Sequence, residues 1–167
     1  MKKIINWIKN IFKALFCNYK IQQKNKVYEI GKFRYKKGSI EARILLHMNA
    51  YRIDYGLKPL VGDRFSNIIA GTRVKDMIAE YSETGEISHF GAGKRHSELI
   101  KLGADCVGEN IAYGYITAQG VVRAWYKSPG HRKNMLNPRY DWTGIYVEEH
   151  LNRNYFCCIF GGEDIVN

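Results

Sequence analysis

The sequence predicts an α+β domain in which helices come first along the chain and a small antiparallel sheet is completed at its end. Three observations predict this class. Apolar residues recur at helical spacing in several segments before residue 128, two β-rich runs follow Pro138, and 46% of the 167 residues are apolar. This apolar share is enough to close a core, and helices in runs beside a few antiparallel strands are typical of layered α+β domains.

Four helices are expected in the body of the chain. The first covers residues 40–55, and the second follows the capping residue Asp63 and extends to about residue 81. The third covers residues 96–102 and the fourth residues 117–127. Each of the three longer helices has an apolar side that we expect to be buried. In the first helix this side is Ile44, Leu45, Met48 and Tyr51, in the second it is Ile68, Ile69, Val74, Met77 and Ile78, and in the fourth it is Val121, Val122 and Trp125.

The end of the chain predicts strands. Two β-rich runs separated by a polar turn predict an antiparallel hairpin made of residues 143–149 and 154–160. A short strand over residues 107–113 is expected to join this hairpin. Cys157 and Cys158 are neighbours on one strand, so they point to opposite faces and a bond between them is not expected. A bond from Cys106 to one of them and free buried thiols both stay open.

The positive charge of the chain is concentrated at its start. The formal net charge is +10, and residues 1–37 hold eleven Lys and Arg against Glu29 alone, whereas residues 38–167 hold fifteen basic and fifteen acidic side chains. A nucleic-acid-binding domain would be expected to carry a basic stripe or patch on its folded body. The distribution therefore predicts a neutral domain over residues 38–167 with a basic arm, and nucleic acid is not an expected partner.

Within the arm, residues 1–17 predict a basic amphipathic helix. On a helical wheel the apolar side chains fill one continuous arc, and the Lys and Asn side chains fill the other. This pattern is typical of a segment that lies in a lipid interface, so we expect contacts with an anionic membrane surface from Trp7, Ile8, Lys9, Ile11, Phe12 and Lys13. Docking of this helix on the domain or on a partner chain, and an unusual export or anchor signal, stay open as alternatives.

Cys17 and the apolar runs of the arm indicate whether the chain is anchored to a membrane, spans it or carries a signal peptide. Cys17 is a candidate lipidation site, because a cysteine beside basic residues can supply a second anchoring signal. No apolar run approaches the roughly 18 residues of a membrane-spanning helix, and residues 14–16 are too few for the core of a secretory signal. We therefore expect no transmembrane span and no standard signal peptide. Residues 18–37 are polar and basic and predict a linker or extension.

Three ionisable residues, His89, Glu109 and His131, sit beside local breaks in the pattern, where a loop can direct a side chain into a cleft. Ser128 and Pro129 predict a helix start that places His131 near the positive end of the dipole, which disfavours the imidazolium form. A neutral imidazole ligates metal, and two His with one carboxylate form a known zinc arrangement. Zn²⁺ or another divalent cation is the cofactor that this pattern indicates. Purely structural hydrogen bonds by all three side chains are the alternative.

Short motifs in a fixed order carry a family resemblance. They are MNAYR at residues 48–52, GLKPL at 56–60, SH at 88–89, GENIA at 108–112, WYKSPGHRKN at 125–134, Gly144, and YF at 155–156. With this set, residues 40–161 resemble the CAP superfamily, named for cysteine-rich secretory proteins, antigen 5 and pathogenesis-related proteins, and in particular its bacterial SCP-like branch. The resemblance implies a three-layer α-β-α sandwich with a small antiparallel sheet, the CAP/SCP-like fold.

The resemblance also implies roles for the residues of the cleft. His89 and His131 would hold the metal, Glu109 is the candidate catalytic residue, and Asn110 and Ser128 would support the cleft. Many eukaryotic members have a second Glu shortly after the tryptophan, but residues 126–128 hold no carboxylate.

Family members are usually extracytoplasmic and are associated with divalent metal, lipid or sterol binding, and occasionally with protease activity. We expect an extracytoplasmic or membrane-surface binding module whose cleft takes a lipid, peptide or cell-envelope ligand. One alternative is a metal-assisted hydrolase, in which the metal activates water and Glu109 orients the water or acts as base. Another is a secreted toxin-like or interaction protein with a vestigial cleft, since fold alone does not decide among the three.

Overall fold

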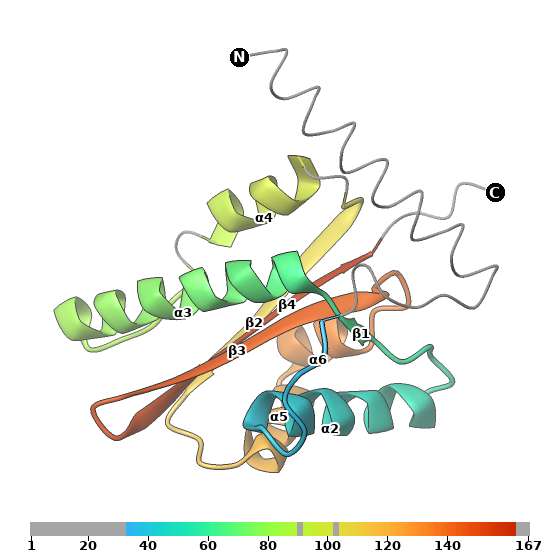
Figure 1. Ribbon diagram of the computed structural model, residues 1–167, viewed down its shortest axis with the longest axis horizontal. Coiled ribbons are helices and arrows are strands. Elements are labelled where there is room, and N and C mark those ends of the chain that lie inside the picture. Colours follow the sequence, from blue (N-terminus) through green and yellow to red (C-terminus); the bar gives the residue numbers. More distant parts are fainter. Residues whose placement is uncertain (1–32, 90–91, 102–103, 163–167) are drawn as a thin grey trace.

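The computed structural model describes residues 33–89, 92–101 and 104–162. The strands in these ranges are β1 (Val61–Gly62), β2 (Cys106–Tyr113), β3 (Trp142–His150) and β4 (Arg153–Gly162). The helices are α2 (Ile40–Asp54), α3 (Arg64–Thr84), α4 (Ala92–Lys101), α5 (Ala118–Lys127) and α6 (Pro129–Met135). Figure 1 shows the sheet between two layers, with α3 and α4 over one face and α2, α5 and α6 over the other. The expected α-β-α sandwich of the α+β class is confirmed.

The strands form one mixed sheet in the order β1-β3-β4-β2. Strand β4 pairs antiparallel with β3 and with β2, which confirms the expected hairpin and its third strand. Leu151 and Asn152 join β3 to β4 in a tight turn with φ of 49° and 59°, the left-handed conformation that two-residue hairpin turns favour. The sequence pattern does not predict the parallel strand β1, because two residues are too few to show an alternation.

Strand β4 separates the two halves of the core, because successive side chains on a strand point to opposite faces. The cluster that includes α2 and α5 receives Phe156, Cys158 and Phe160. The cluster that includes α3 and α4 receives Tyr155, Cys157 and Ile159. Cys157 and Cys158 therefore face opposite layers, as expected, and both are buried free thiols.

The helices begin at capping residues that the sequence offers. Backbone N–H groups in the first turns of α2, α3 and α5 donate to the side chains of Ser39, Asp63 and Thr117. Two expectations are wrong in detail. Helix α4 begins at Ala92 rather than at residue 96. Ile68 of α3 is 57% exposed, because the buried side of that helix includes small or polar residues, namely Ser66, Gly71 and Arg73.

Phe33 and Tyr35, expected in the linker or extension, contact the sheet. The Phe33 N–H donates to the Gly62 carbonyl at 3.1 Å, and the Tyr35 hydroxyl accepts from the Ile145 N–H at 2.6 Å. The expected amphipathic helix over residues 1–17, with Cys17, lies outside the described residues. None of the helices within the described ranges has both the length and the apolar character needed to cross a membrane.

Candidate functional site

His89, Glu109 and His131 come from three separate elements and line one cavity. His89 lies between α3 and α4, Glu109 lies on β2, and His131 lies on α6. The cavity has a volume of about 510 Å³, and its other lining residues include His96, Ser128 and Asn134. The fold thus brings the three expected residues together at β2, which is an edge strand of the sheet.

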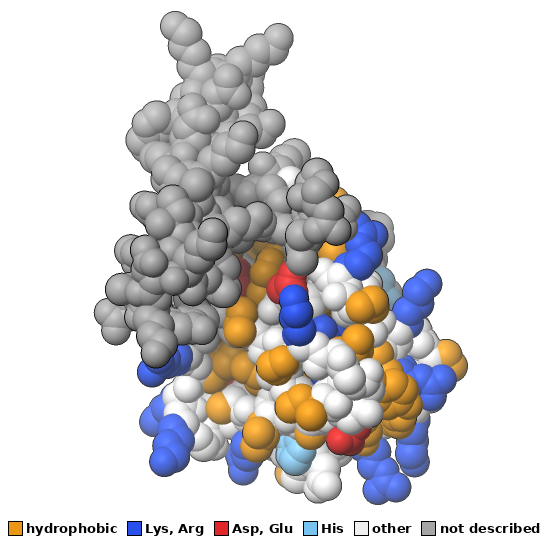
Figure 2. Space-filling view, turned by 90° about the vertical axis from the view of Figure 1, so that its right-hand side faces the viewer, with side chains coloured by type: hydrophobic (Ala, Val, Ile, Leu, Met, Phe, Trp, Pro, Cys, Tyr) orange, Lys and Arg blue, Asp and Glu red, His pale blue; other side chains and the backbone are white. Residues whose placement is uncertain are grey.

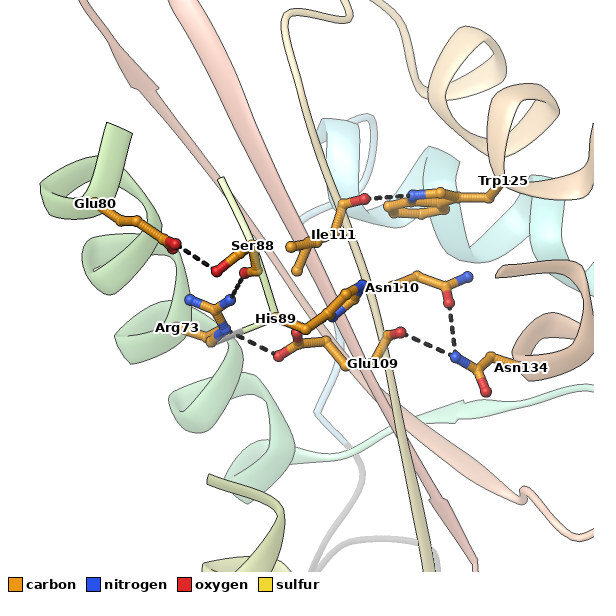
Figure 3. Close-up of polar contacts among 9 residues, drawn as sticks. All are labelled: Arg73, Glu80, Ser88, His89, Glu109, Asn110, Ile111, Trp125 and Asn134. Carbon is orange, nitrogen blue, oxygen red and sulfur yellow. Dashed lines mark hydrogen bonds and ion pairs between the residues drawn. The ribbon is translucent and has the colours of Figure 1, made fainter. Parts of the chain in front are cut away.

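Glu109 is buried, and both of its carboxylate oxygens have partners. Oε2 accepts a hydrogen bond from Nε of Arg73, on α3, at 3.1 Å, as Figure 3 shows, and Oε1 is 2.8 Å from Nδ1 of His89. The Arg73 and Glu109 side chains are 0% and 2% exposed, so this is a buried ion pair. Arg73 also donates to the carbonyl of Ser88, the residue before His89. Together these contacts fix the His89 ring, which is itself 55% exposed.

Ser128 holds the second imidazole. Its hydroxyl lies 3.0 Å from Nδ1 of His131, and it makes no capping hydrogen bond to α6. The expected helix start at Ser128 and Pro129 is present, but the hydroxyl serves the imidazole rather than the helix end. The pKa of His131 is lowered first by burial and second by His89. The neutral ring is therefore favoured, as expected, and burial and a second imidazole are two causes.

Asn110 and Asn134 join strand β2 to helix α6. Nδ2 of Asn110 donates to the His131 carbonyl at 3.0 Å. Nδ2 of Asn134 donates to the Glu109 carbonyl at 2.9 Å and to Oδ1 of Asn110 at 3.0 Å. Figure 3 shows the hydrogen bonds that Asn134 donates to Glu109 and Asn110. Asn110 thus has the contacts of a residue that supports the cleft, whereas the sequence pattern alone gives Asn134 no role.

Arg73 and His96 belong to the site but are not found by sequence reasoning. The signal for Arg73 is a basic residue on the buried side of α3, at helical spacing from Ala70 and Met77. The signal for His96 is a further His, seven positions after His89. Nε2 of His96 is buried and has no hydrogen-bond partner among the described residues. The pKa of His96 is lowered chiefly by burial.

The two expected imidazoles suit a divalent cation. The ring centroids of His89 and His131 are 6.2 Å apart. Two imidazoles bound at about 2.1 Å to one tetrahedral zinc ion have centroids about 5.3 Å apart, so a bound ion would draw these two rings about 1 Å closer together. Oxygen atoms hold Nδ1 of both rings, which is the usual way in which proteins orient metal-binding imidazoles.

A closed site with three protein ligands is not formed in this arrangement. In the part of the chain that the structure describes, no three His, Cys, Asp or Glu side chains make up a ready metal-binding group. Glu109 is placed to orient His89 rather than to ligate a metal, because Arg73 and His89 occupy its two oxygens.

A sheet between two helical layers, with two imidazoles and a buried carboxylate at its edge strand, defines a domain of the CAP type. Residues 45–160 match the family model described as the Cysteine-rich secretory protein family, CAP. The chain belongs to this family.

Two relatives come from Bacillus subtilis. The chain is 35% identical over 109 residues to the uncharacterized protein YkwD. It is 32% identical over 120 residues to the uncharacterized membrane protein YlbC. These matches cover 65% and 69% of this chain but 42% and 34% of the two relatives. The chain therefore spans less than half the length of these curated relatives.

Solved structures share the fold. An outer surface protein from Borrelia burgdorferi has a TM-score of 0.63 and 22% identity, over 80% of this chain and 99% of that one. The crystal structure of NaASP2 with Zn²⁺ has a TM-score of 0.54 and 18% identity, over 75% of this chain and 84% of that one. Identities this low show a common architecture and no more.

Proposed function

We propose that this protein is a ligand-binding module whose cleft binds a divalent cation, Zn²⁺ first among the candidates, between His89 and His131. The observation that carries the proposal is the pair of rings, 6.2 Å apart, whose Nδ1 atoms are held by Glu109 and Ser128. In this arrangement Nε2 is the nitrogen of each ring that these contacts leave for a ligand. The similar fold of NaASP2, a structure with Zn²⁺, supports the proposal.

The contacts of Glu109 favour binding over hydrolysis. A general base must reach the water that it deprotonates, and both oxygens of Glu109 already face Arg73 and His89. Residues 126–128 offer no second carboxylate. A bound cation would supply positive charge that attracts a carboxylate or phosphate group. Lipids, peptides and cell-envelope polymers carry such groups, and they are the ligand classes that we propose for the cleft.

Calorimetry with Zn²⁺ tests this proposal on the full chain. We expect the wild type to bind the ion, and we expect His89→Ala and His131→Ala each to weaken binding at least roughly tenfold. His150→Ala is the matched control, because His150 ends β3 and does not line the cavity. Affinity should fall as the pH drops below the imidazole range, since protons compete for the nitrogens. No binding by the wild type, or unchanged binding by the double His variant, would refute the proposal.

We also propose that residues 1–17 hold the domain at an anionic membrane surface outside the cytoplasm. The support is the amphipathic pattern of this segment and the eleven Lys and Arg of residues 1–37. On the face seen in Figure 2, the Lys and Arg of the described body lie at separate places, many around the edge and some near the middle, with hydrophobic side chains between them. One relative, YlbC, is named a membrane protein, and the similar Borrelia burgdorferi structure is named an outer surface protein.

Sedimentation with anionic phospholipid vesicles tests the role of the arm. The wild type should bind, and Lys9→Gln/Lys13→Gln should bind more weakly, since each basic residue near an anionic surface contributes about 1 kcal/mol. The same pair of changes at Lys127 and Lys133, on the domain, is the control. Mass spectrometry of membrane-extracted protein tests lipidation of Cys17. Equal binding by the arm variant and the control would rule out this use of the arm.

A further inference from the structure

The cleft contains a third imidazole, that of His96 on α4. His96 lines the same cavity as His89 and His131. Its Nε2 atom is buried and has no hydrogen-bond partner within the described ranges. Buried polar atoms are nearly always paired in proteins, so an unpartnered nitrogen on a side chain that lines a cavity needs a reason. A ligand that enters the cavity and pairs with Nε2 is such a reason.

We propose that His96 is a third binding residue for the cation at His89 and His131, and that it acts through Nε2. This inference rests on the cation binding proposed above. Imidazole nitrogen is a preferred ligand of zinc, and three imidazoles with one open position form a known kind of zinc site. His96 lines the same cavity as Glu109 and His89, so it lies close to the other groups of the site.

Binding requires the ring of His96 to turn toward the other two. The three imidazoles are not yet gathered into a metal-binding group among the described residues. Nε2 of His96 breaks no hydrogen bond when the ring turns, because it has none to lose there. The carboxylate of Glu109 is not open as a partner for His96 either, since Arg73 and His89 occupy both of its oxygens. A cation is therefore a partner that Nε2 of His96 can gain without giving up a hydrogen bond within the described ranges.

A third nitrogen would change what the cleft can bind. Two imidazoles alone leave most of the coordination sphere of a cation to water. With His96 added, three positions of a tetrahedral zinc ion are filled by the protein and one stays open. That open position would take a single carboxylate or phosphate oxygen of the ligand.

Zinc affinity, measured by competition with a chelating dye, tests the proposal on the full chain. We expect His96→Gln to bind Zn²⁺ at least roughly tenfold more weakly than the wild type, because loss of residues that only support metal ligands already weakens binding about 10- to 100-fold. His96→Cys should keep most of the affinity, since thiolate is also a zinc ligand. His150→Gln is the matched control and should bind like the wild type.

Nitrogen-15 NMR of the histidine side chains tests on the wild type whether His96 binds Zn²⁺, and so it does not depend on the folding of a variant. Zn²⁺ should shift Nε2 of His96 together with Nε2 of His89 and His131, and should leave His150 unchanged. A wild type that binds Zn²⁺ with no shift at His96, or with equal affinity in His96→Gln, overturns the third ligand and leaves the two-imidazole site standing. A wild type that binds no Zn²⁺ overturns both.

Discussion

Arg73→Met would leave the carboxylate of Glu109 buried without its guanidinium. The two side chains are 0% and 2% exposed, and Nε and Oε2 are 3.1 Å apart. Removing one partner of such a pair costs about 3–5 kcal/mol, because the remaining charge is buried without compensation. The variant also loses the hydrogen bond from Arg73 to the Ser88 carbonyl. We therefore expect the free energy of unfolding to fall by about 3–5 kcal/mol.

Urea denaturation, followed by tryptophan fluorescence, measures this loss. Lys75→Met is the matched control, because it removes an exposed cation from the same helix and should change stability by about 0.5 kcal/mol or less. The double variant Arg73→Met/Glu109→Gln should recover much of the loss, since it removes both charges. A single variant within about 1 kcal/mol of the wild type would show that the pair does not compensate a buried charge, and the reasoning would fail.

Packing, burial and ionisation at other positions give further measurable expectations. Gly144→Ala would place a Cβ 2.0 Å from the backbone of Ser66, so it should destabilise the domain by about 1–3 kcal/mol or more. Gly93→Ala, which meets open space, should cause no loss in the same thermal unfolding assay. Burial raises the pKa of the Cys157 and Cys158 thiols, so alkylation followed by mass spectrometry should modify the half-buried Cys106 before either of them. Rapid labelling of Cys158 in the native protein would contradict this order. Burial, and after it His89, lowers the pKa of His131 below its usual value of 6.5 in the folded protein. As the pH falls below 6.5, the unfolded chain therefore binds a proton at His131 more readily than the folded chain does, and the metal-free protein should lose stability. His131→Gln should lose less unfolding free energy than the wild type between about pH 7 and pH 5, and equal losses would count against the shift.

The order of elements is predictable because it depends on local pattern. The hairpin follows from two β-rich runs around a polar turn, and the starts of α2, α3 and α5 follow from Ser39, Asp63 and Thr117. Burial on α3 is less predictable, because it depends on what packs there from elsewhere. A Cβ added at Gly71 would lie 3.3 Å from the Tyr146 ring, so the buried side of α3 has a small residue there while Ile68 faces solvent.

The cleft is predictable only in part, because some of its residues are held by segments that are distant in the sequence. His89, Glu109 and His131 stand in motifs with local breaks, so the chain itself marks them. Buried arginines carry no such mark, because distant segments supply their partners. Arg52 is 1% exposed, and its guanidinium donates to carbonyls of Lys58, Met135, Asn137 and Tyr140. Arg73 is buried in the same way by β2 and by the loop that carries His89.

Glu109 and Asn110 explain why the cleft lies at the edge of the sheet. Neighbouring side chains on a strand point to opposite faces, so Glu109 meets Arg73 in one helical layer and Asn110 meets α6 in the other. Glu109 holds His89, and Asn110 holds the backbone of His131. A shift of β2 by one residue along β4 would exchange the two faces and separate the imidazoles. The register of one edge strand therefore sets the spacing of the two rings. A ligand that bridges the rings would bind this register alone, and so it would stabilise both layers against unfolding.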